Sequence, residues 1–484
     1  MRQNSIFAAQ LKETMNPLPL SRLLLLSILT MAIGCKNNPA DADLQDAPKT
    51  FQMRQMKYPL WVRNSSIYEV NIRQYTPEGT FQAFRQHLPR LKKMGVGIIW
   101  FMPIYPISIT KRKGELGSYY SVADYTKVNP EFGTFEDFQD LVAEIHRLNM
   151  HVILDWVPNH TGWDHTWITT HPEWYTHVND TISHALNNDG TPTDWYDVAD
   201  LNYEVGPMRN TMIESMKFWL RAADVDGFRC DMAGMVPDDF WDQARPALEE
   251  VKPIFMLAEW EGNPNHFETC FQANYGWKLF HILNGIAKGE KNANDIETYL
   301  KEDRSENPAG YYHMNFTSNH DENSWAGSAP ERLGDALEAM SVLAFTFEGT
   351  PLLYSGQESR NEKRLSFYEK DAIDWDDYSL EDFYTKLIQL KHYNKSLWNG
   401  NEGGKLVRIN EGDEIFAFMR EKEGQRVIVL VNCTDHDATT TLTEAVHSMS
   451  EVFGKKEYNI AVGKPIKLKP WEFWLMANPS VVTQ

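Results

Sequence analysis

Between residue 61 and about residue 400, short apolar runs alternate with segments in which apolar residues recur every three or four positions. The run at residues 96–101 is continuous, which is typical of a parallel strand covered on both faces. Residues 134–148 have the spacing of an amphipathic helix, and Thr134 and Asp137 match a capping box at its start. Strand and helix alternate about eight times, so the pattern predicts an α/β fold built as a (β/α)8 barrel over residues 61–399.

The spacing also predicts where the individual elements of this barrel lie. Strands are expected over residues 67–72, 96–101, 151–155, 227–231, 253–259, 271–275, 313–317 and 350–354. The main helices are expected over residues 80–94, 134–148, 207–222 and 332–345.

The barrel pattern is interrupted once and ends before the carboxyl terminus. After the third strand comes an irregular stretch that is rich in Trp, His, Asp and Asn. Long loops inside a barrel are usually functional, so we expect a small inserted subdomain over the site, at about residues 161–205. After residue 400 the segments become β-rich and are separated by Gly- and Asp-bearing turns, which predicts a C-terminal antiparallel β-sandwich over residues 400–484.

The amino terminus has the pattern of a targeting segment. Arg22 precedes an apolar run at residues 23–33, which is too short for a membrane span but typical of a signal peptide. The run ends in Ala-Ile-Gly before Cys35, which resembles a bacterial lipobox. Residues 1–35 are therefore expected to be a signal peptide and residues 36–60 a tether, with lipidated Cys35 holding an exported protein at a membrane of the cell envelope. Ordinary secretory cleavage near the same point is the alternative.

Composition and charge narrow the possible partners. The 484 residues are 42% hydrophobic and 24% charged, as in ordinary globular proteins, and the formal net charge is −20. Such an excess of negative charge argues against a nucleic-acid partner and against adhesion to anionic lipid. Besides Cys35 there are three scattered cysteines, which form neither a disulfide framework nor a metal-ligand pattern. Nothing in the sequence indicates an organic cofactor.

Polar residues gather where the predicted strands end, which is where barrels of this kind place their chemistry. Side chains alternate along a strand, so Arg229 and Asp231 share one face, and an adjacent cation favours an ionised carboxylate suited to nucleophilic attack. An internal ion pair explains this stretch equally well by itself. Apolar residues precede Glu259, which favours the protonated form that a general acid requires. Buried carboxylates are costly, so their gathering at several strand ends favours function over structure.

Four of these strand ends carry stretches that together resemble the motifs of the α-amylase superfamily of glycoside hydrolases. These stretches are residues 155–160, 227–231, 255–259 and 316–321. They occur in the family's order and at plausible spacing, and the resemblance covers about residues 61–400. The resemblance implies that Asp231 is the nucleophile, Glu259 the acid/base and Asp321 the third carboxylate.

The resemblance also implies residues that bind the substrate, and an optional metal. Its substrate-binding positions are Tyr120, which would stack on the sugar, and Asp155, His160, Arg229, Trp260 and His320. For Trp260, simple packing is the alternative. A frequent calcium site of the family is matched by Asn159 and Asp200, but calcium-free members resemble this chain as well. The family often has Lys-His three and four residues after the nucleophile, where leaving-group sugars bind. This chain has Gly234-Met235 there, so the resemblance does not predict which residues form the leaving-group subsite.

The expected function is therefore that of a retaining α-glycoside hydrolase that acts on α-glucans or maltooligosaccharides. An α-glucan transglycosylase with the same three carboxylates is one alternative. A catalytically inactive glycan-binding barrel is the other, although that class is expected to lack at least one carboxylate.

Overall fold

The computed structural model describes residues 59–375 and 377–478. The expected signal peptide, Cys35 and nearly all of the expected tether lie outside the described residues. Within the described ranges, no helix is both long enough and apolar enough to cross a membrane.

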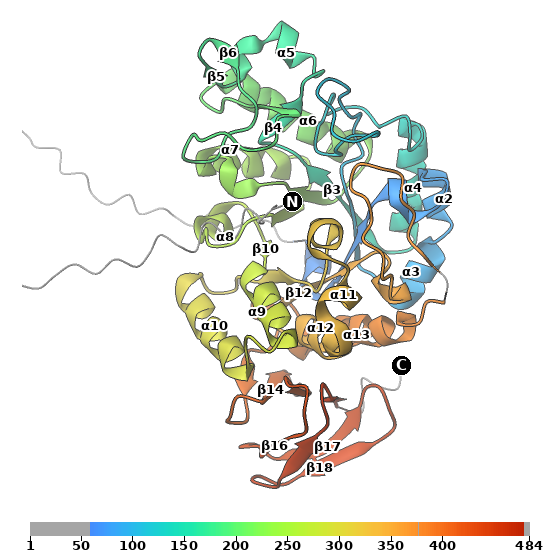
Figure 1. Cartoon of the computed structure of the whole chain (residues 1–484), viewed down its shortest axis with the longest axis vertical. Helices are drawn as coiled ribbons and strands as arrows, with labels where there is room; N and C mark the ends of the chain where they lie inside the picture. Colours follow the sequence, from blue (N-terminus) through green and yellow to red (C-terminus); the bar gives the residue numbers. More distant parts are fainter. Residues whose placement is uncertain (1–58, 376, 479–484) are drawn as a thin grey trace, which may run out of the picture. The chain divides into compact units, whose positions relative to one another are not determined.

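Eight parallel strands close into a barrel, as the alternating pattern predicts (Figure 1). Around the barrel the order is β1-β12-β11-β10-β9-β8-β3-β2. Each barrel strand therefore lies beside the barrel strands that precede and follow it in the sequence, and β1 pairs with β12 to close the barrel. The strands are β1 (Ile67–Val70), β2 (Ile98–Phe101), β3 (His151–Trp156), β8 (Gly227–Cys230), β9 (Phe255–Ala258), β10 (Ala273–Tyr275), β11 (His313–Asn315) and β12 (Gly349–Tyr354). Each predicted strand is present, including the short sixth strand.

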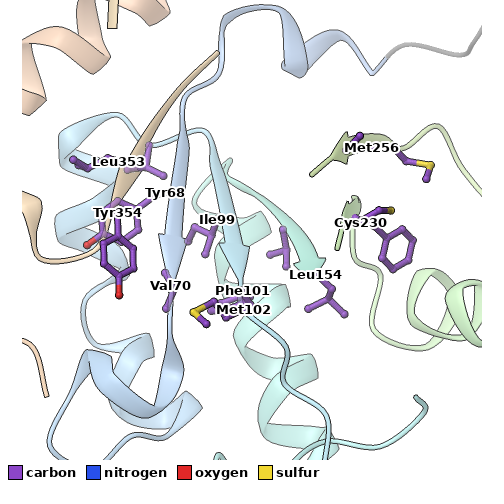
Figure 2. Packing of buried hydrophobic residues seen from close by; sticks show 14 of the residues in the cluster. Tyr68, Val70, Ile99, Phe101, Met102, Leu154, Cys230, Met256, Leu353 and Tyr354 are labelled. Atoms are coloured by element: carbon purple, nitrogen blue, oxygen red, sulfur yellow. The ribbon is translucent and has the colours of Figure 1, made fainter. Parts of the chain in front are cut away.

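Alternate side chains of the strands enter two different apolar clusters. Ile98 and Trp100 of β2 belong to a cluster inside the barrel, while Ile99 and Phe101 belong to the cluster between the barrel and its helices. Figure 2 shows this outer cluster, in which Leu154 and Cys230 come from neighbouring strands. The strands are therefore covered on both faces, which explains why their sequences are continuous apolar runs.

Helices follow most of the strands, and two of the predicted helices are each broken in two. The helix expected over residues 80–94 is divided into α2 (Phe81–Arg85) and α3 (Leu88–Met94), because Pro89 in the first turn of α3 has no amide hydrogen. The helix expected over residues 332–345 is divided into α11 (Ala329–Leu333) and α12 (Leu337–Thr346), at Gly334 with φ +53°. The other long helices are α4 (Phe135–Arg147), α6 (Gly206–Ala222), α7 (Asp238–Glu249), α9 (Trp277–Ala287), α10 (Ala293–Glu306) and α13 (Glu381–Tyr393).

The irregular stretch after β3 forms a small subdomain of short elements. Two antiparallel pairs hold it together: β4 (His160–Gly162) with β7 (Val198–Asp200), and β5 (His177–Val178) with β6 (Thr181–Ile182). Because β4 starts only four residues after β3 ends, this subdomain begins directly at the carboxyl end of the barrel.

The C-terminal residues form antiparallel sheets, red in Figure 1. Six strands pair in the order β13-β14-β15-β20-β17-β18, and β16 pairs with β19 in a small second sheet. These strands are β13 (Leu406–Arg408), β14 (Ile415–Lys422), β15 (Gln425–Asn432), β16 (Ala438–Thr440), β17 (Val446–Glu451), β18 (Glu457–Ile460), β19 (Ile466–Leu468) and β20 (Phe473–Ala477). One apolar cluster lies between the two sheets, so the arrangement is a sandwich of unequal layers.

The larger sheet is attached to the barrel by its other face and by one buried cation. Phe416 and Phe418 of β14 point into the apolar cluster that also contains the barrel's helices. The guanidinium of Arg420 is buried and donates to the backbone carbonyl of Phe347, at 2.6 Å, and to that of Gly404, at 2.8 Å. The buried cation of Arg420 therefore links β14 to the end of α12.

Candidate active site

The parallel strand register brings the polar strand ends together. Asp155 of β3 lies opposite Arg229 of β8, and Arg229 lies opposite Leu257 of β9. The ladder continues past the strands, since the amide of Asp231 donates to the Trp156 carbonyl at 2.8 Å and that of Glu259 donates to the Cys230 carbonyl at 2.9 Å. The two carboxylates that the sequence assigns to catalysis thus follow neighbouring strands at the same end of the barrel.

One buried guanidinium lies at the centre of the site. Nη1 of Arg229 lies 2.8 Å from Oδ1 of Asp155 and 3.0 Å from Oδ1 of Asp231. Nη2 of the same residue lies 2.7 Å from Oε1 of Glu259, and its Nε donates to the hydroxyl of Tyr275 at 3.0 Å. Arg229 therefore contacts three carboxylates at once, and all four charged groups are buried.

Three carboxylates share the Arg229 cation, and this bears on the charge of Asp231. That Arg229 keeps the Asp231 carboxylate ionised stays a prediction. Burial, followed by the negative charge of Glu259, raises the pKa of Asp231 well above its usual range, and Arg229 only opposes this rise. Burial also raises the pKa of Asp155 to about 7, against the opposing charges of Arg229 and His320. One cation cannot compensate three buried carboxylates, so the cluster favours holding a proton at neutral pH.

The surroundings of Glu259 also differ from the expectation. The apolar residues before it in β9 predicted an apolar environment, but its carboxylate pairs with Arg229 and accepts the amide hydrogen of Met232 at 2.9 Å. Met232 has φ +42°, a left-handed conformation that is uncommon for a residue other than glycine. This turn directly after Asp231 aims a backbone donor at the second carboxylate, and such strain is typical of functional sites.

His320 joins the third carboxylate to the rest of the site. Its Nδ1 lies 2.5 Å from Oε1 of Glu69, and its Nε2 lies 3.4 Å from Oδ2 of Asp321. Although burial opposes it, the negative charges of Asp321 and Glu69 raise the pKa of His320 to about 9, so the ring is an imidazolium at neutral pH. The hydroxyl of Tyr120 lies 2.7 Å from Nε2 of His320 and donates to Oδ2 of Asp155 at 3.1 Å. The two halves of the site are thus joined through Tyr120.

Three residues of the site were missed from the sequence. Glu69 is a fully buried carboxylate inside the apolar strand β1, and this isolated charge was a signal that the sequence offered. Trp100 donates its Nε1 hydrogen to Oδ2 of Asp155 at 3.2 Å, and Tyr275 accepts from Arg229. Both aromatic residues lie in apolar strands, so their polar atoms gave no distinguishing pattern.

The other predicted substrate-binding residues lie at the edge of this cluster. His160 is buried at the start of the inserted subdomain, with its ring 5.9 Å from that of Trp195. Burial, reinforced by the charge of Lys113, lowers the pKa of His160 to about 3, so its ring is neutral. The half-buried ring of Trp260 lies against Gly234, where a Cβ atom would approach it to 2.1 Å. Gly234, which replaces a larger residue of the family pattern, is therefore needed for this position of Trp260.

The candidate calcium ligands lie close together in the backbone. Asp200 pairs with His160 between β7 and β4, and the amide of Leu201 donates to the Asn159 carbonyl at 3.2 Å. Burial raises the pKa of Asp200, whose Oδ1 accepts the amide of Leu186 at 3.2 Å. The half-buried carboxylate of Asp200 and the buried side-chain amide of Asn159 offer oxygen ligands of the kind that Ca²⁺ prefers. Calcium binding at this place stays a prediction.

In two other clusters of histidine and acidic residues, the side chains form ion pairs with one another or with a neighbouring lysine. Nε2 of His313 lies 2.9 Å from Oδ1 of Asp303, and its Nδ1 contacts the side-chain oxygen of Asn274, so both nitrogens face acceptors. In the second cluster, Nε2 of His146 lies 2.7 Å from Oδ2 of Asp226, whose Oδ1 lies 3.1 Å from Nζ of Lys252. These contacts account for both clusters as charge networks of the scaffold.

Comparisons with known proteins agree with this geometry. The family of α-amylase catalytic domains matches residues 48–199 and 192–386, and that of C-terminal domains of maltogenic amylases matches residues 405–475. α-Amylase MalA of Haloarcula japonica is 26% identical over 430 residues, which are 84% of this chain and 60% of that protein. α-Amylase 3 of Dictyoglomus thermophilum is 25% identical over 439 residues, which are 77% of this chain and 85% of that protein.

A solved structure extends the agreement to the whole described fold. The crystal structure of the maltogenic α-amylase AmyB from Thermotoga neapolitana superposes with a TM-score of 0.77 at 27% identity, over 87% of this chain and 99% of that one. The catalytic-domain family covers well over half of the sequence, and its barrel carries the Arg229 cluster described above. The chain belongs to the α-amylase family.

Proposed function

We propose that the protein is a retaining α-glycoside hydrolase that acts on α-glucans or maltooligosaccharides. The observation that carries the proposal is that Asp231 and Glu259 pair with the two terminal nitrogens of one guanidinium, that of Arg229. A single carbon atom separates these nitrogens, which supports a separation near the roughly 5–5.5 Å of a retaining pair instead of the wider gap of an inverting pair.

In the first step, Asp231 attacks the anomeric carbon and Glu259 protonates the departing oxygen. This step needs an ionised Asp231 and a proton on Glu259. Burial and mutual repulsion disfavour three ionised carboxylates around one cation, so the cluster retains a proton that Glu259 can pass to the departing oxygen. Arg229 holds both reacting carboxylates in position, and it stays a cation throughout.

In the second step, Glu259 removes a proton from water, and the water displaces Asp231 from the sugar. Asp321 and the imidazolium of His320 lie side by side, one negative and one positive, which suits them to hold adjacent hydroxyl groups of the same sugar ring. The negative charge of Asp321 also favours the positively charged transition state.

The two alternatives differ in what they require of this site. An inactive glycan-binding barrel is expected to have lost a catalytic carboxylate, and all three are present here. A transglycosylase uses the same residues but gives the intermediate to a sugar hydroxyl in place of water. Chromatography of the products formed from maltooligosaccharides separates these outcomes, because transfer yields chains longer than the substrate.

Replacing any one carboxylate of the triad is expected to abolish most turnover. Asp231→Asn, Glu259→Gln and Asp321→Asn each keep the size of the side chain but remove its charge, so we expect kcat to fall by about a thousandfold or more. The measurement is the rate of reducing-end release from maltoheptaose, with folding checked by circular dichroism. Asp335→Asn, at an exposed position after α11, is the matched control and is expected to keep full activity. Near-native activity in a folded triad variant would remove that residue from the mechanism.

The first-formed product is expected to have the α configuration. Attack by Asp231 inverts the anomeric carbon and attack by water inverts it again, so two inversions restore the original configuration. Proton NMR during the first minutes of hydrolysis resolves the two anomers before they interconvert. If the β-anomer is formed first, Asp231 is not a nucleophile and the double-displacement mechanism is wrong.

We further propose that the mature protein is an exported lipoprotein whose lipid is attached to Cys35. The support is the apolar run at residues 23–33 followed by Ala-Ile-Gly-Cys. Mass spectrometry of the mature protein from bacterial membranes should detect a diacylglyceryl-modified Cys35 as the first residue, and Cys35→Ser should release the protein from the membrane. An unmodified first residue at another position would refute the anchor while leaving export intact.

A further inference from the structure

The charge network around His313 has a third acidic member, Glu261, which the ion pair of that histidine does not explain. Glu261 lies in the loop after β9, two residues after Glu259. Its Oε2 accepts the amide hydrogen of Lys278 at 2.7 Å, whereas its Oε1 is buried and has no hydrogen-bond partner among the described residues. A buried carboxylate oxygen without a donor is costly, so a cation beside this atom is favourable.

Ligand atoms of Glu261, Asp303 and His313 lie close together. One carboxylate oxygen of each acidic residue and one ring nitrogen of the histidine lie within 4.8 Å of one another. Asp303 belongs to α10 and His313 is the first residue of β11, so three separate parts of the chain supply the cluster. With bond lengths of about 2 Å, one metal ion can contact all three atoms.

Outer contacts orient these side chains as they do in metal sites. The Nδ1 hydrogen of His313 points to the side-chain oxygen of Asn274, which leaves Nε2 of the ring facing Asp303. One oxygen of Asp303 accepts the hydroxyl hydrogen of Tyr311, and Glu261 is held through its Oε2. Metal-binding histidines and carboxylates are typically fixed in this way, by hydrogen bonds to the atoms that do not contact the metal.

The charge of the cluster favours a divalent cation over the protons that it holds. Burial raises the pKa of Glu261 to about 7, although the charges of His313 and Lys278 oppose the rise. Although burial opposes it, the charge of Asp303 raises the pKa of His313, so the ring carries a proton in its ion pair. A metal ion that binds here replaces the proton of His313 and, below about pH 7, that of Glu261 as well.

The other titratable groups that face the cluster do not compete with such an ion. Nζ of Lys278, on α9, lies 3.1 Å from a carboxylate oxygen of Glu306 and is paired with it. Burial raises the pKa values of Tyr299 on α10 and of Tyr311 before β11, so both hydroxyls are neutral. The two carboxylates of the cluster are therefore free to bind a second cation.

We propose that Glu261, Asp303 and His313 bind one divalent transition-metal ion with the chemistry of Zn²⁺. One imidazole and two carboxylates suit this ion, whereas Mg²⁺ and Ca²⁺ prefer oxygen ligands alone. The half-buried Glu261 gives the ion a path from solvent, and the ring of Phe267 on α8 (Asn265–Thr269) covers that of His313 at 5.8 Å.

The bound ion ties the loop after β9 to α10 and to the start of β11. The site does not rest on the proposed function, because none of its three residues is assigned a part in the reaction. Its occupation is therefore measured by binding and stability, without reference to turnover.

The direct test is titration of the purified protein with Zn²⁺ by isothermal titration calorimetry, at about pH 8 and with saturating Ca²⁺. The calcium keeps any site of oxygen ligands alone occupied. We expect one Zn²⁺ per chain, with release of protons to the buffer. Binding should weaken as the pH falls to about 6, because the ligands must lose their protons before they bind the metal.

Single substitutions locate the ion within the chain. Glu261→Gln removes a ligand charge with little change of size and should weaken the Kd about a hundredfold or more. Tyr311→Phe removes only the hydroxyl that orients Asp303 and should weaken the Kd about tenfold. Glu268→Gln, at an exposed position on α8, is the matched control and should bind Zn²⁺ like the parent.

Thermal unfolding gives a second readout on the same proteins. A hundredfold excess of Zn²⁺ over its Kd should raise the Tm of the parent and of Glu268→Gln by about 3 °C. Glu261→Gln should show no rise at the same concentration. Circular dichroism checks that each variant is folded, and if Glu261→Gln does not fold, Tyr311→Phe decides, because it changes no charge.

Equal Zn²⁺ affinity in Glu261→Gln and Glu268→Gln would overturn the proposal, as would a parent that binds no Zn²⁺ at about pH 8. Loss of binding in His146→Gln, with unchanged binding in Glu261→Gln, would place the ion at the other histidine cluster and would equally contradict the site. X-ray absorption of the zinc-loaded protein is expected to show one imidazole among oxygen ligands. Two imidazoles in the coordination sphere would refute the assignment.

Discussion

The whole site depends on one buried cation shared among three carboxylates. Arg229 contacts Asp155, Asp231 and Glu259 within 3.0 Å, and all four groups are buried. Burying a charge costs several kcal/mol unless a partner compensates it, so the three carboxylates are tolerable only around this guanidinium. The same imbalance leaves a surplus of negative charge, and that surplus makes a proton available where an acid/base catalyst needs one.

The barrel is built to bring this cation and its carboxylates together. Gly227 begins β8 with φ +153°, and a Cβ atom there would lie 1.8 Å from the Phe255 carbonyl of β9. The absence of a side chain therefore lets the two catalytic strands approach closely. Trp100 and Tyr275 then cover the guanidinium from inside the barrel, at 5.1 and 5.5 Å from their ring centroids. These rings exclude water, which strengthens each ion pair of the cluster.

The barrel and the C-terminal sheets were predictable from their hydrophobic periods, and the inserted subdomain from the long irregular stretch that interrupts the barrel pattern. The three carboxylates that meet around Arg229 were also predictable, since their motifs stand at strand ends, whereas its aromatic neighbours Trp100 and Tyr275 were not. Pro89 and Gly334 indicate the two helix breaks in the sequence itself. The apolar spacing continues across both positions, and it therefore predicted two longer helices. The charge state of Asp231 could not be predicted from the sequence alone. It depends on how many carboxylates share one cation, which only the packing of separate strands decides.

The most direct test of this account is to trap the sugar on the enzyme. A fluorinated α-glucosyl fluoride, which forms the covalent intermediate faster than water releases it, would be incubated with the protein. Peptide mass spectrometry would then locate the attached sugar. The account predicts one sugar per chain, bound as an ester to the carboxylate of Asp231. A sugar on Asp155 or Glu259, or turnover of the reagent without any labelled peptide, would contradict the central role assigned to the Arg229–Asp231 pair.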